Sequence, residues 1–283
     1  MCSSDLPNGK QLALCVVVIL EHTEWEPPAD AYSLRRPSGG IFPLPRPDYL
    51  RLTHREYGHR VGIFRVLDAL GRRGIPATIA VDALTAENYP WLARHCIARG
   101  YELMAHGVAA TRLITSKLSE AEERATIARS LDALEAVTGR KPAGWFGPEA
   151  AESDRTPALL AEAGVRYLCD WPNDEQPYPM TTPTGSLTAL PMFLETDDEF
   201  ALWTRRMSPD RWSRMVGEAA ARMHDDGADN GRLLVLTLRP WLIGQPFRIG
   251  ALEDALDDIM ALPAVWAATG SAITDWYRRV GDS

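Results

Sequence analysis

The stretch that decides the fold is residues 12–26, LALCVVVILEHTEWE. Residues 12–20 are almost continuously apolar, and the residues that follow are at once charged and aromatic. The apolar run is too short to cross a bilayer, and it is typical of a parallel strand buried on both faces. Because the loops after such strands hold the functional groups of α/β proteins, we expect the loop that begins at Glu21 to form part of a functional site.

Strand-like and helix-like patterns alternate along most of the remaining chain. Further strands are expected at 76–81, 101–105, 143–146, 165–169, 186–192, 233–238 and 264–268. Helices are expected at 61–70, 88–99, 119–139, 154–163, 209–226, 251–261 and 271–279. This alternation implies parallel strands and right-handed crossovers. Since no dinucleotide-binding or phosphate-binding glycine motif is present, we expect an α/β fold of seven or eight units, a distorted and closed TIM-like barrel rather than an open doubly wound sheet.

One segment departs from the alternation. Residues 26–58 are rich in Pro, Gly, Tyr and Arg and follow neither the helical nor the strand period. We expect a single domain over 1–283 with a long irregular loop at 26–58. Such a loop could cover a site, or form a subunit contact through its apolar residues, which are Ile41, Phe42, Leu44 and Tyr49.

Composition excludes several classes of function. The chain of 283 residues has a formal net charge of −8 and no cluster of Lys or Arg, so we expect no nucleic-acid partner. Its four cysteines form no CxxC motif and are expected to be buried thiols in a reducing compartment. Neither a signal peptide nor a membrane-spanning segment is recognisable, so we expect a cytoplasmic protein with no membrane partner.

Ionisable and amide side chains gather directly after the expected strands. They are Glu21, His22, Glu24, Asp82, His106, Arg112, Glu149, Asp170, Asn173, Asp174, Gln176, Glu195, Asp197, Asp198, Arg239 and Gln245. Barrel enzymes keep their catalytic groups at this edge, so the pattern favours an enzyme. For some members a structural role is the simpler interpretation: the run 195–199 is expected to be a solvated loop, and Arg239 could pair with Glu149 or Asp170 as a structural bridge.

Six short motifs carry a family resemblance. They are Tyr57-Gly58-x-Arg60-Val61-Gly62, Ile75-Pro76-Ala77-Thr78, Glu102-x-x-Ala105-His106-Gly107, Gly139-Arg140-x-Pro142-x-Gly144-Trp145, Asp170-Trp171-x-Asn173-Asp174-x-Gln176-Pro177-Tyr178 and Pro240-Trp241-x-x-Gly244-Gln245-Pro246-x-Arg248. With them the chain resembles the polysaccharide deacetylase (NodB-homology) superfamily, and more closely its intracellular allantoinase-like and cyclic-imide-hydrolase-like branch. The resemblance implies a distorted (β/α) barrel, hydrolysis of an amide-type C–N bond, and a homo-oligomer, either a dimer or a tetramer.

The departures from the family pattern concern its metal site and its catalytic acid. Zinc-dependent members use an Asp on the first strand and a His-x-x-x-His pair after the third, and the His of a late Leu-His-Pro serves as an acid near the leaving group. Here Ala110 stands four residues after His106, and Arg239 precedes the late proline. Arginine stays protonated below a pKa of about 12 and cannot shuttle protons. We therefore expect no metal and no cofactor. The alternative is Zn²⁺ held by Glu21 or Glu24 with His22 and His106.

A metal-free hydrolase needs a base and a group that stabilises an oxyanion. The expected catalytic residues are Glu21, Glu24, His106 and Arg239, with one of the two glutamates as a base whose pKa is raised by desolvation. The expected substrate-binding residues are His22, Trp25, Arg112, Trp145, Glu149, Asp170, Trp171 and Gln245. The three tryptophans among them could wall a small planar ring.

The resulting prediction is a hydrolase of a C–N bond other than a peptide bond, in a small cyclic amide, imide or ureide. Three alternatives remain open at this point. One is a zinc-dependent deacetylase with rearranged ligands, another is a biosynthetic lyase or cyclase, and the third is a binding protein without catalytic activity. The changed residues Ala110 and Arg239 are the reason for keeping the binding protein.

Overall fold

The computed structural model describes residues 5–29, 31–32 and 47–281. Its central element is β1 (Leu12–Leu20), which is buried along its whole length. β1 pairs in parallel with β2 (Ala77–Val81) and with β8 (Arg232–Leu238). Alternate β1 side chains enter two different hydrophobic clusters, Val16 with the helices and Val17 inside the curled sheet. Because both faces are covered, the strand tolerates no polar residue.

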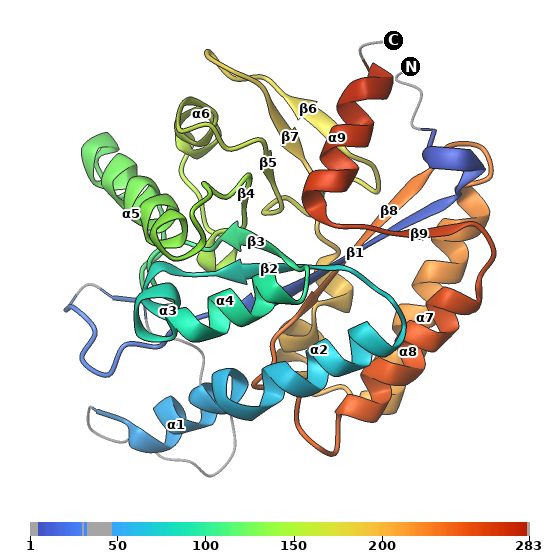
Figure 1. Ribbon diagram of the computed structural model, residues 1–283, viewed down its shortest axis with the longest axis horizontal. Coiled ribbons are helices and arrows are strands. Elements are labelled where there is room, and N and C mark those ends of the chain that lie inside the picture. The colour runs from blue at the N-terminus through green and yellow to red at the C-terminus, as the bar shows by residue number, and fades with distance from the viewer. Residues whose placement is uncertain (1–4, 30, 33–46, 282–283) are drawn as a thin grey trace.

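The sheet curls around a hydrophobic interior (Figure 1). Its strands run in the order β6 (Tyr178–Met180), β7 (Leu187–Ala189), β5 (Tyr167–Leu168), β4 (Gly144–Trp145), β3 (Glu102–Ala105), β2, β1 and β8, and β9 (Val265–Ala267) pairs with the start of β1. All pairs are parallel except β6 with β7. The expected α/β class with a distorted TIM-like barrel is confirmed, in the form of a curled half-barrel.

Closure of the barrel differs from the expectation. No ladder joins β8 to β6 within the described ranges. The chain just before β6 instead contacts the start of β8: the backbone N of Leu233 donates to the carbonyl of Glu175 over 2.7 Å, and Gln176 Nε2 donates to the carbonyl of Gly231 over 2.8 Å. β6, the strand at the other edge, runs antiparallel to its neighbour, so the parallel order of the sheet ends there.

Helices pack around the sheet, most of them on its outer face, whereas Ile273 of the C-terminal helix enters the inner cluster (Figure 1). They are α1 (Tyr49–Tyr57), α2 (Ile63–Arg72), α3 (Ala83–Asn88), α4 (Pro90–Ala98), α5 (Glu120–Thr138), α6 (Thr156–Glu162), α7 (Pro209–Asp226), α8 (Ile249–Ala261) and α9 (Gly270–Gly281). Short 3₁₀ turns lie at Pro7–Gly9, Pro148–Ala150 and Leu194–Thr196, and π-helical turns at Gly58–Gly62 and Glu199–Thr204. The expected capping box is present, since the Ser119 hydroxyl and the Glu122 carboxylate each bond the other residue's backbone N–H.

Three element predictions were wrong. Residues 49–57 form α1 instead of irregular chain; Asp48 caps this helix by accepting a hydrogen bond from the Arg51 N–H. The helix expected at 88–99 is present as α4, but the preceding α3, which Asp82 caps, was not expected. The antiparallel β6 was not expected at all. Ile41, Phe42 and Leu44 lie outside the described residues, and the subunit contact proposed for them stays a prediction.

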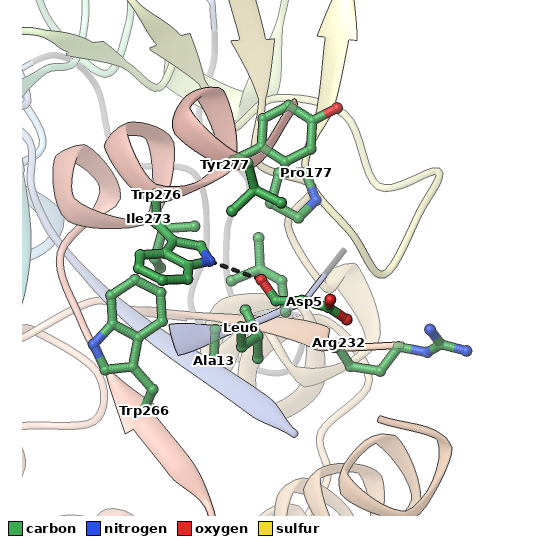
Figure 2. Close-up of a pocket in the computed structure, with 12 residues that line it drawn as sticks. Asp5, Leu6, Ala13, Pro177, Arg232, Trp266, Ile273, Trp276 and Tyr277 are labelled. Carbon is green, nitrogen blue, oxygen red and sulfur yellow. Dashed lines mark hydrogen bonds between the residues drawn. The ribbon is translucent and has the colours of Figure 1, made fainter. Parts of the chain in front are cut away.

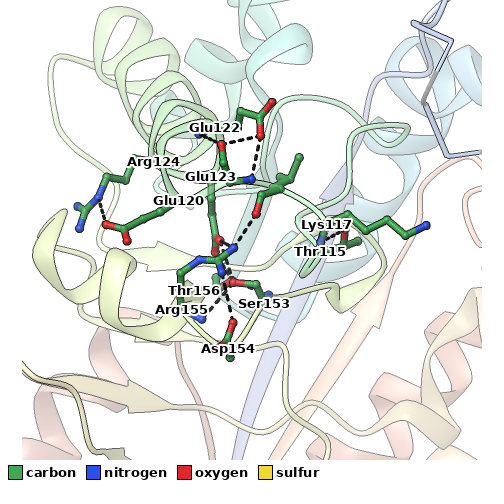
Figure 3. A network of polar contacts seen from close by, with 12 residues as sticks. Thr115, Lys117, Glu120, Glu122, Glu123, Arg124, Ser153, Asp154, Arg155 and Thr156 are labelled. Atoms are coloured by element: carbon green, nitrogen blue, oxygen red, sulfur yellow. Dashed lines mark hydrogen bonds and ion pairs between the residues drawn. The ribbon is translucent and has the colours of Figure 1, made fainter.

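A buried carboxylate joins two of the outer helices (Figure 3). Glu123 on α5 is fully buried and accepts hydrogen bonds from Ser153 Oγ over 2.8 Å and from Thr156 Oγ1 over 2.5 Å. Arg155 Nη2 lies 3.2 Å from the same carboxylate. These partners offset the cost of burying the charge, so the network fixes the start of α6 against α5.

Two expectations from composition can be compared with the fold. Cys15, Cys96 and Cys169 are buried free thiols, as expected, and Cys2 lies outside the described residues. In the part of the chain that the structure describes, every helix is too short or too polar to span a lipid bilayer.

Candidate active site at the strand ends

The first residues after β1 and β3 meet at the carboxyl-terminal edge of the sheet. Glu21 and His106 are both buried, with His106 Nε2 3.8 Å from Glu21 Oε2. His106 Nδ1 lies 2.5 Å from the Phe146 carbonyl oxygen. A carbonyl can only accept a hydrogen bond, so Nδ1 carries a proton. His106 Nε2 then faces Glu21 and has no hydrogen-bond partner among the described residues.

Two buried arginines surround these groups. Arg55 Nη1 lies 2.7 Å from Glu21 Oε1, and Arg55 Nη2 lies 3.0 Å from Glu199 Oε1. Arg239 Nε lies 2.6 Å from Glu199 Oε2, and its Nη1 lies 2.7 Å from Asp197 Oδ2. Arginine matches planar carboxylates well, so these two arginines and three carboxylates form one continuous ion-pair network.

This network sets the charge on Glu21. Burial alone would raise its pKa, but the contact with His106 and the charges of Arg55 and Arg239 outweigh burial and lower the pKa to about 2. The expectation that desolvation raises the pKa of this carboxyl group was therefore wrong. With a pKa this low, Glu21 is ionised at neutral pH and is a weak base.

A cavity of about 210 Å³ opens beside this network. Its polar lining is Glu149, Asp197, Glu199, Thr204 and Arg239, and its apolar lining is Phe146, Ala150, Met192, Leu194 and Phe200. All of these residues follow β4, β7 or β8. The cavity thus combines polar and apolar side chains at the carboxyl-terminal ends of these strands, and of the predicted site residues it includes Glu149 and Arg239.

Glu149 is the carboxylate of this cavity that solvent reaches most readily. Its backbone has φ +57° and that of Ala150 has φ +50°. Such left-handed conformations are uncommon for residues with a Cβ and occur often at functional sites. Partial desolvation by the surrounding protein raises the pKa of Glu149, and the negative charge of Glu199 raises it further. Glu149 was expected to bind substrate, and its environment suits a general base as well.

The other predicted residues of the first loop lie outside the cavity lining. Glu24 is 2.6 Å from Arg112 Nη2 and accepts a hydrogen bond from Thr111. His22 holds the loop through its backbone N–H, which donates to Asp82. Trp25 is 40% exposed and packs edge-on against Tyr49. Glu24 and Trp25 line a smaller hollow instead.

The later predicted residues are also distributed differently. Trp145 is completely buried in a hydrophobic cluster, so the prediction that it walls a substrate was wrong. Asp170 accepts a hydrogen bond from the Gly147 N–H, and burial beside Glu152 raises its pKa well above the usual range. Trp171 Nε1 donates to Glu152, and Gln245 Nε2 donates to the Trp241 carbonyl. None of these side chains lines the cavity.

The prediction that 195–199 is a solvated loop was wrong for its middle residues. Asp197 and Asp198 are buried, because both face Arg239. Thr237 Oγ1 donates to Asp197, and the Arg239 N–H donates to Asp198. Arg239 thus pairs with these acids, and neither Glu149 nor Asp170 is among its ion-pair partners. The one cue in the sequence was the position of the acids after an expected strand.

Zinc does not fit the side chains of this centre. Position 110 holds a buried alanine, and no group of three or more potential ligands occurs within the described ranges. Glu21, the carboxylate nearest to His106, is already held by the guanidinium of Arg55. A cation placed there would lie against a fixed positive charge, whereas zinc needs at least three protein ligands.

A second hollow lies at the opposite edge of the sheet (Figure 2). It is lined mainly by apolar side chains such as Leu6, Trp266 and Ile273, and Trp276 Nε1 donates to the carbonyl of Asp5 over 2.7 Å. It brings together no imidazole and no pair of carboxylates. The chemistry therefore points to the cavity at the carboxyl-terminal edge.

Comparison with known proteins agrees with the motifs. The family model for polysaccharide deacetylase matches residues 56–168. A Schizosaccharomyces pombe protein named "Putative polysaccharide deacetylase" is 24% identical over 255 residues, which cover 83% of this chain and 79% of that protein. The resemblance to the polysaccharide deacetylase superfamily is confirmed. It indicates a hydrolase that acts on C–N bonds.

Solved structures show the same fold. The structure of Puue allantoinase is 24% identical, covers 98% of this chain and 93% of its own, and superposes with a TM-score of 0.87. A structure from Mycobacterium smegmatis, named like the yeast protein, is 26% identical, covers 99% of this chain and 94% of its own, and has a TM-score of 0.81. The fold shared with these structures thus extends well beyond residues 56–168, which the family model matches.

Proposed function

We propose that this protein is a metal-independent hydrolase of a C–N bond in a small cyclic amide, imide or ureide. The observation that carries the proposal is that Glu149 and Arg239 line one cavity of about 210 Å³ at the strand ends. Glu149 has a raised pKa and is open to solvent, which suits a base. Arg239 supplies a fixed positive charge, which suits the stabilisation of an oxyanion.

The proposed reaction uses only side chains of this chain. Glu149 takes a proton from a water molecule, whose oxygen forms a bond to the carbonyl carbon. Arg239 donates a hydrogen bond to the developing oxyanion; its Nη2 has no hydrogen-bond partner among the residues described. Glu149 then returns the proton to the nitrogen as the C–N bond breaks, which leaves a carboxylic acid and an N–H group.

Phe146, Phe200, Met192 and Leu194 provide apolar surface on which a small planar ring could pack. The charged network behind them holds Glu21 and His106 next to, and not within, the cavity lining. We assign to this pair an electrostatic role, since Glu21 is too weak a base to activate water.

The test is a panel of cyclic imides, hydantoins and linear ureides, with ring opening followed by chromatography in the presence of a chelator. On any compound that is hydrolysed, Glu149→Gln is expected to lower kcat by about 10²- to 10⁴-fold, the usual contribution of a general base. Glu135→Gln, an exposed change on α5, is the matched control and should keep wild-type activity. Full activity of the Glu149 variant would exclude Glu149 as the base.

The family match favours a second candidate, the deacetylation of a small acetamide. The same cavity and the same base would serve it, because an acetamide is also an amide-type C–N bond. N-acetylglucosamine and its short oligomers therefore belong in the panel, with acetate release as the readout. Activity only on these compounds would replace the cyclic substrate class while keeping the proposed catalytic residues.

A further inference from the structure

The buried guanidinium of Arg55 connects three distant parts of the chain. Arg55 lies on α1 and is only 6% exposed. It contacts Glu21 after β1 and Glu199 in the segment between β7 and α7, and it lies over the ring of Trp241, with its Cζ 3.9 Å from the ring centroid. No role follows for it from the sequence motifs, because none of them includes residue 55.

Charges alternate along the resulting chain of ion pairs. It runs from Glu21, next to His106, through Arg55 and Glu199 to Arg239 at the cavity wall. Glu199 is held from both sides, with one oxygen 3.0 Å from Arg55 and the other 2.6 Å from Arg239. Since each arginine is a planar fork of donors, the orientation of each carboxylate is fixed by its two neighbours.

We propose that Arg55 is a positioning residue of the cavity, which holds Glu199 against Arg239 and fixes Glu21 beside His106. The role of the cavity rests on the proposed function, but the ion-pair chain itself can be measured without a substrate. Lysine cannot replace Arg55 fully, because one ammonium group cannot contact the two carboxylates through separate nitrogens in a fixed plane.

The first readout is the titration of the Glu21 carboxyl carbon by ¹³C NMR, recorded from pH 7 downwards. The protein variants are Arg55→Gln, Arg55→Lys and, as a control, Arg72→Gln. Arg72 lies on the neighbouring α2, is largely exposed and pairs with Glu253 at the surface. We expect the midpoint to rise by about 1 to 3 pH units in Arg55→Gln, as for removal of an adjacent opposite charge. A smaller rise is expected in Arg55→Lys, and none in Arg72→Gln.

An unchanged Glu21 midpoint in both Arg55 variants would overturn the proposal. Arg55→Lys keeps the buried positive charge and is expected to fold even if Arg55→Gln does not. In that case its own smaller rise of the Glu21 midpoint supports the proposal, and an unchanged midpoint overturns it. On a compound that the wild type hydrolyses, Arg55→Lys should lower kcat, change the pH profile of kcat/KM and leave the melting temperature close to that of the wild type. If the wild type hydrolyses nothing in the panel, the proposed function fails, whereas the titration still decides the role of Arg55.

Discussion

Two glutamates at the strand ends illustrate how environment decides chemistry. Glu21 is enclosed by Arg55, Arg239 and His106, which hold its pKa near 2. Glu149 lines the open cavity, where the surrounding protein and Glu199 raise its pKa. The same side chain is thus a permanent anion at one position and a candidate base at the other.

The low pKa of Glu21 predicts a specific loss of stability in acid. Its native pKa of about 2 lies below the ordinary value of 4.5, so ionised Glu21 stabilises the fold above pH 4.5. This stability is lost as the pH falls from 4.5 towards 2. The contribution is on the order of 3 kcal/mol in the free energy of unfolding.

Urea denaturation at pH 7, 5, 4 and 3 measures this effect. The free energy of unfolding of the wild type should fall more steeply between pH 5 and pH 3 than that of Glu21→Gln, which has no carboxyl group to protonate. Equal slopes for the two proteins would show that Glu21 is not held as an anion in the native state.

At the scale of elements, two sequence motifs that are far apart in the chain pack against each other. A Cβ added to Gly62 would lie 2.0 Å from the Pro240 carbonyl oxygen, and one added to Gly58 would lie 2.8 Å from the Trp241 N. Both glycines belong to the π-helical turn between α1 and α2. The turn therefore approaches the loop after β8 more closely than any other residue would permit, and this contact places Arg55 beside Glu199.

Gly62→Ala is accordingly expected to destabilise the protein by about 1 to 3 kcal/mol, the usual cost of overpacking. The matched control is Gly250→Ala in α8, where an added Cβ meets nothing within 4 Å. Alanine is the better helix former by about 1 kcal/mol, so the control should raise stability slightly. Thermal or urea unfolding checks both, and a Gly62 variant as stable as the wild type would show that the turn can move away from the loop.

At the scale of the whole molecule, two arginines lie in the region where the family resemblance implies a metal centre and a catalytic acid. Arg55 pairs with Glu21 after the first strand, and Arg239 stands at the position of the late histidine and pairs with Asp197 and Glu199. The same resemblance implies an oligomer, which stays a prediction.

Zinc is therefore expected to have no effect on this protein. Added ZnCl₂ or EDTA should leave both the melting temperature and the turnover of any hydrolysed compound unchanged. If zinc bound the native state and its free concentration were 100 times the Kd, it would stabilise the protein by about 2.7 kcal/mol. Thermal unfolding detects such a change easily. One tightly bound zinc per chain, measured by plasma mass spectrometry, would contradict the proposed metal-independent mechanism. The candidate ligands would then again be Glu21, His22, Glu24 and His106.

The sequence by itself determined the buried central strand, the β–α alternation and the position of the functional edge. These features follow from local patterns, because apolar runs, capping residues and glycines predict the strands and helices formed by residues close together in the chain. Local patterns also explain why residues 49–57 were mistaken for irregular chain, since Arg55 is a charged residue on the buried side of that helix.

Only the tertiary structure decided which charged groups meet. Arg55 is separated from Glu21 by 34 positions and from Glu199 by 144, and no periodicity in the sequence relates them. The curl of the sheet brings the ends of β1, β4, β7 and β8 together, and their mutual burial then sets each pKa and each ion pair. The cavity is formed by residues that follow several different strands. Glu149 and Arg239 could therefore be assigned to it only after the strands were placed.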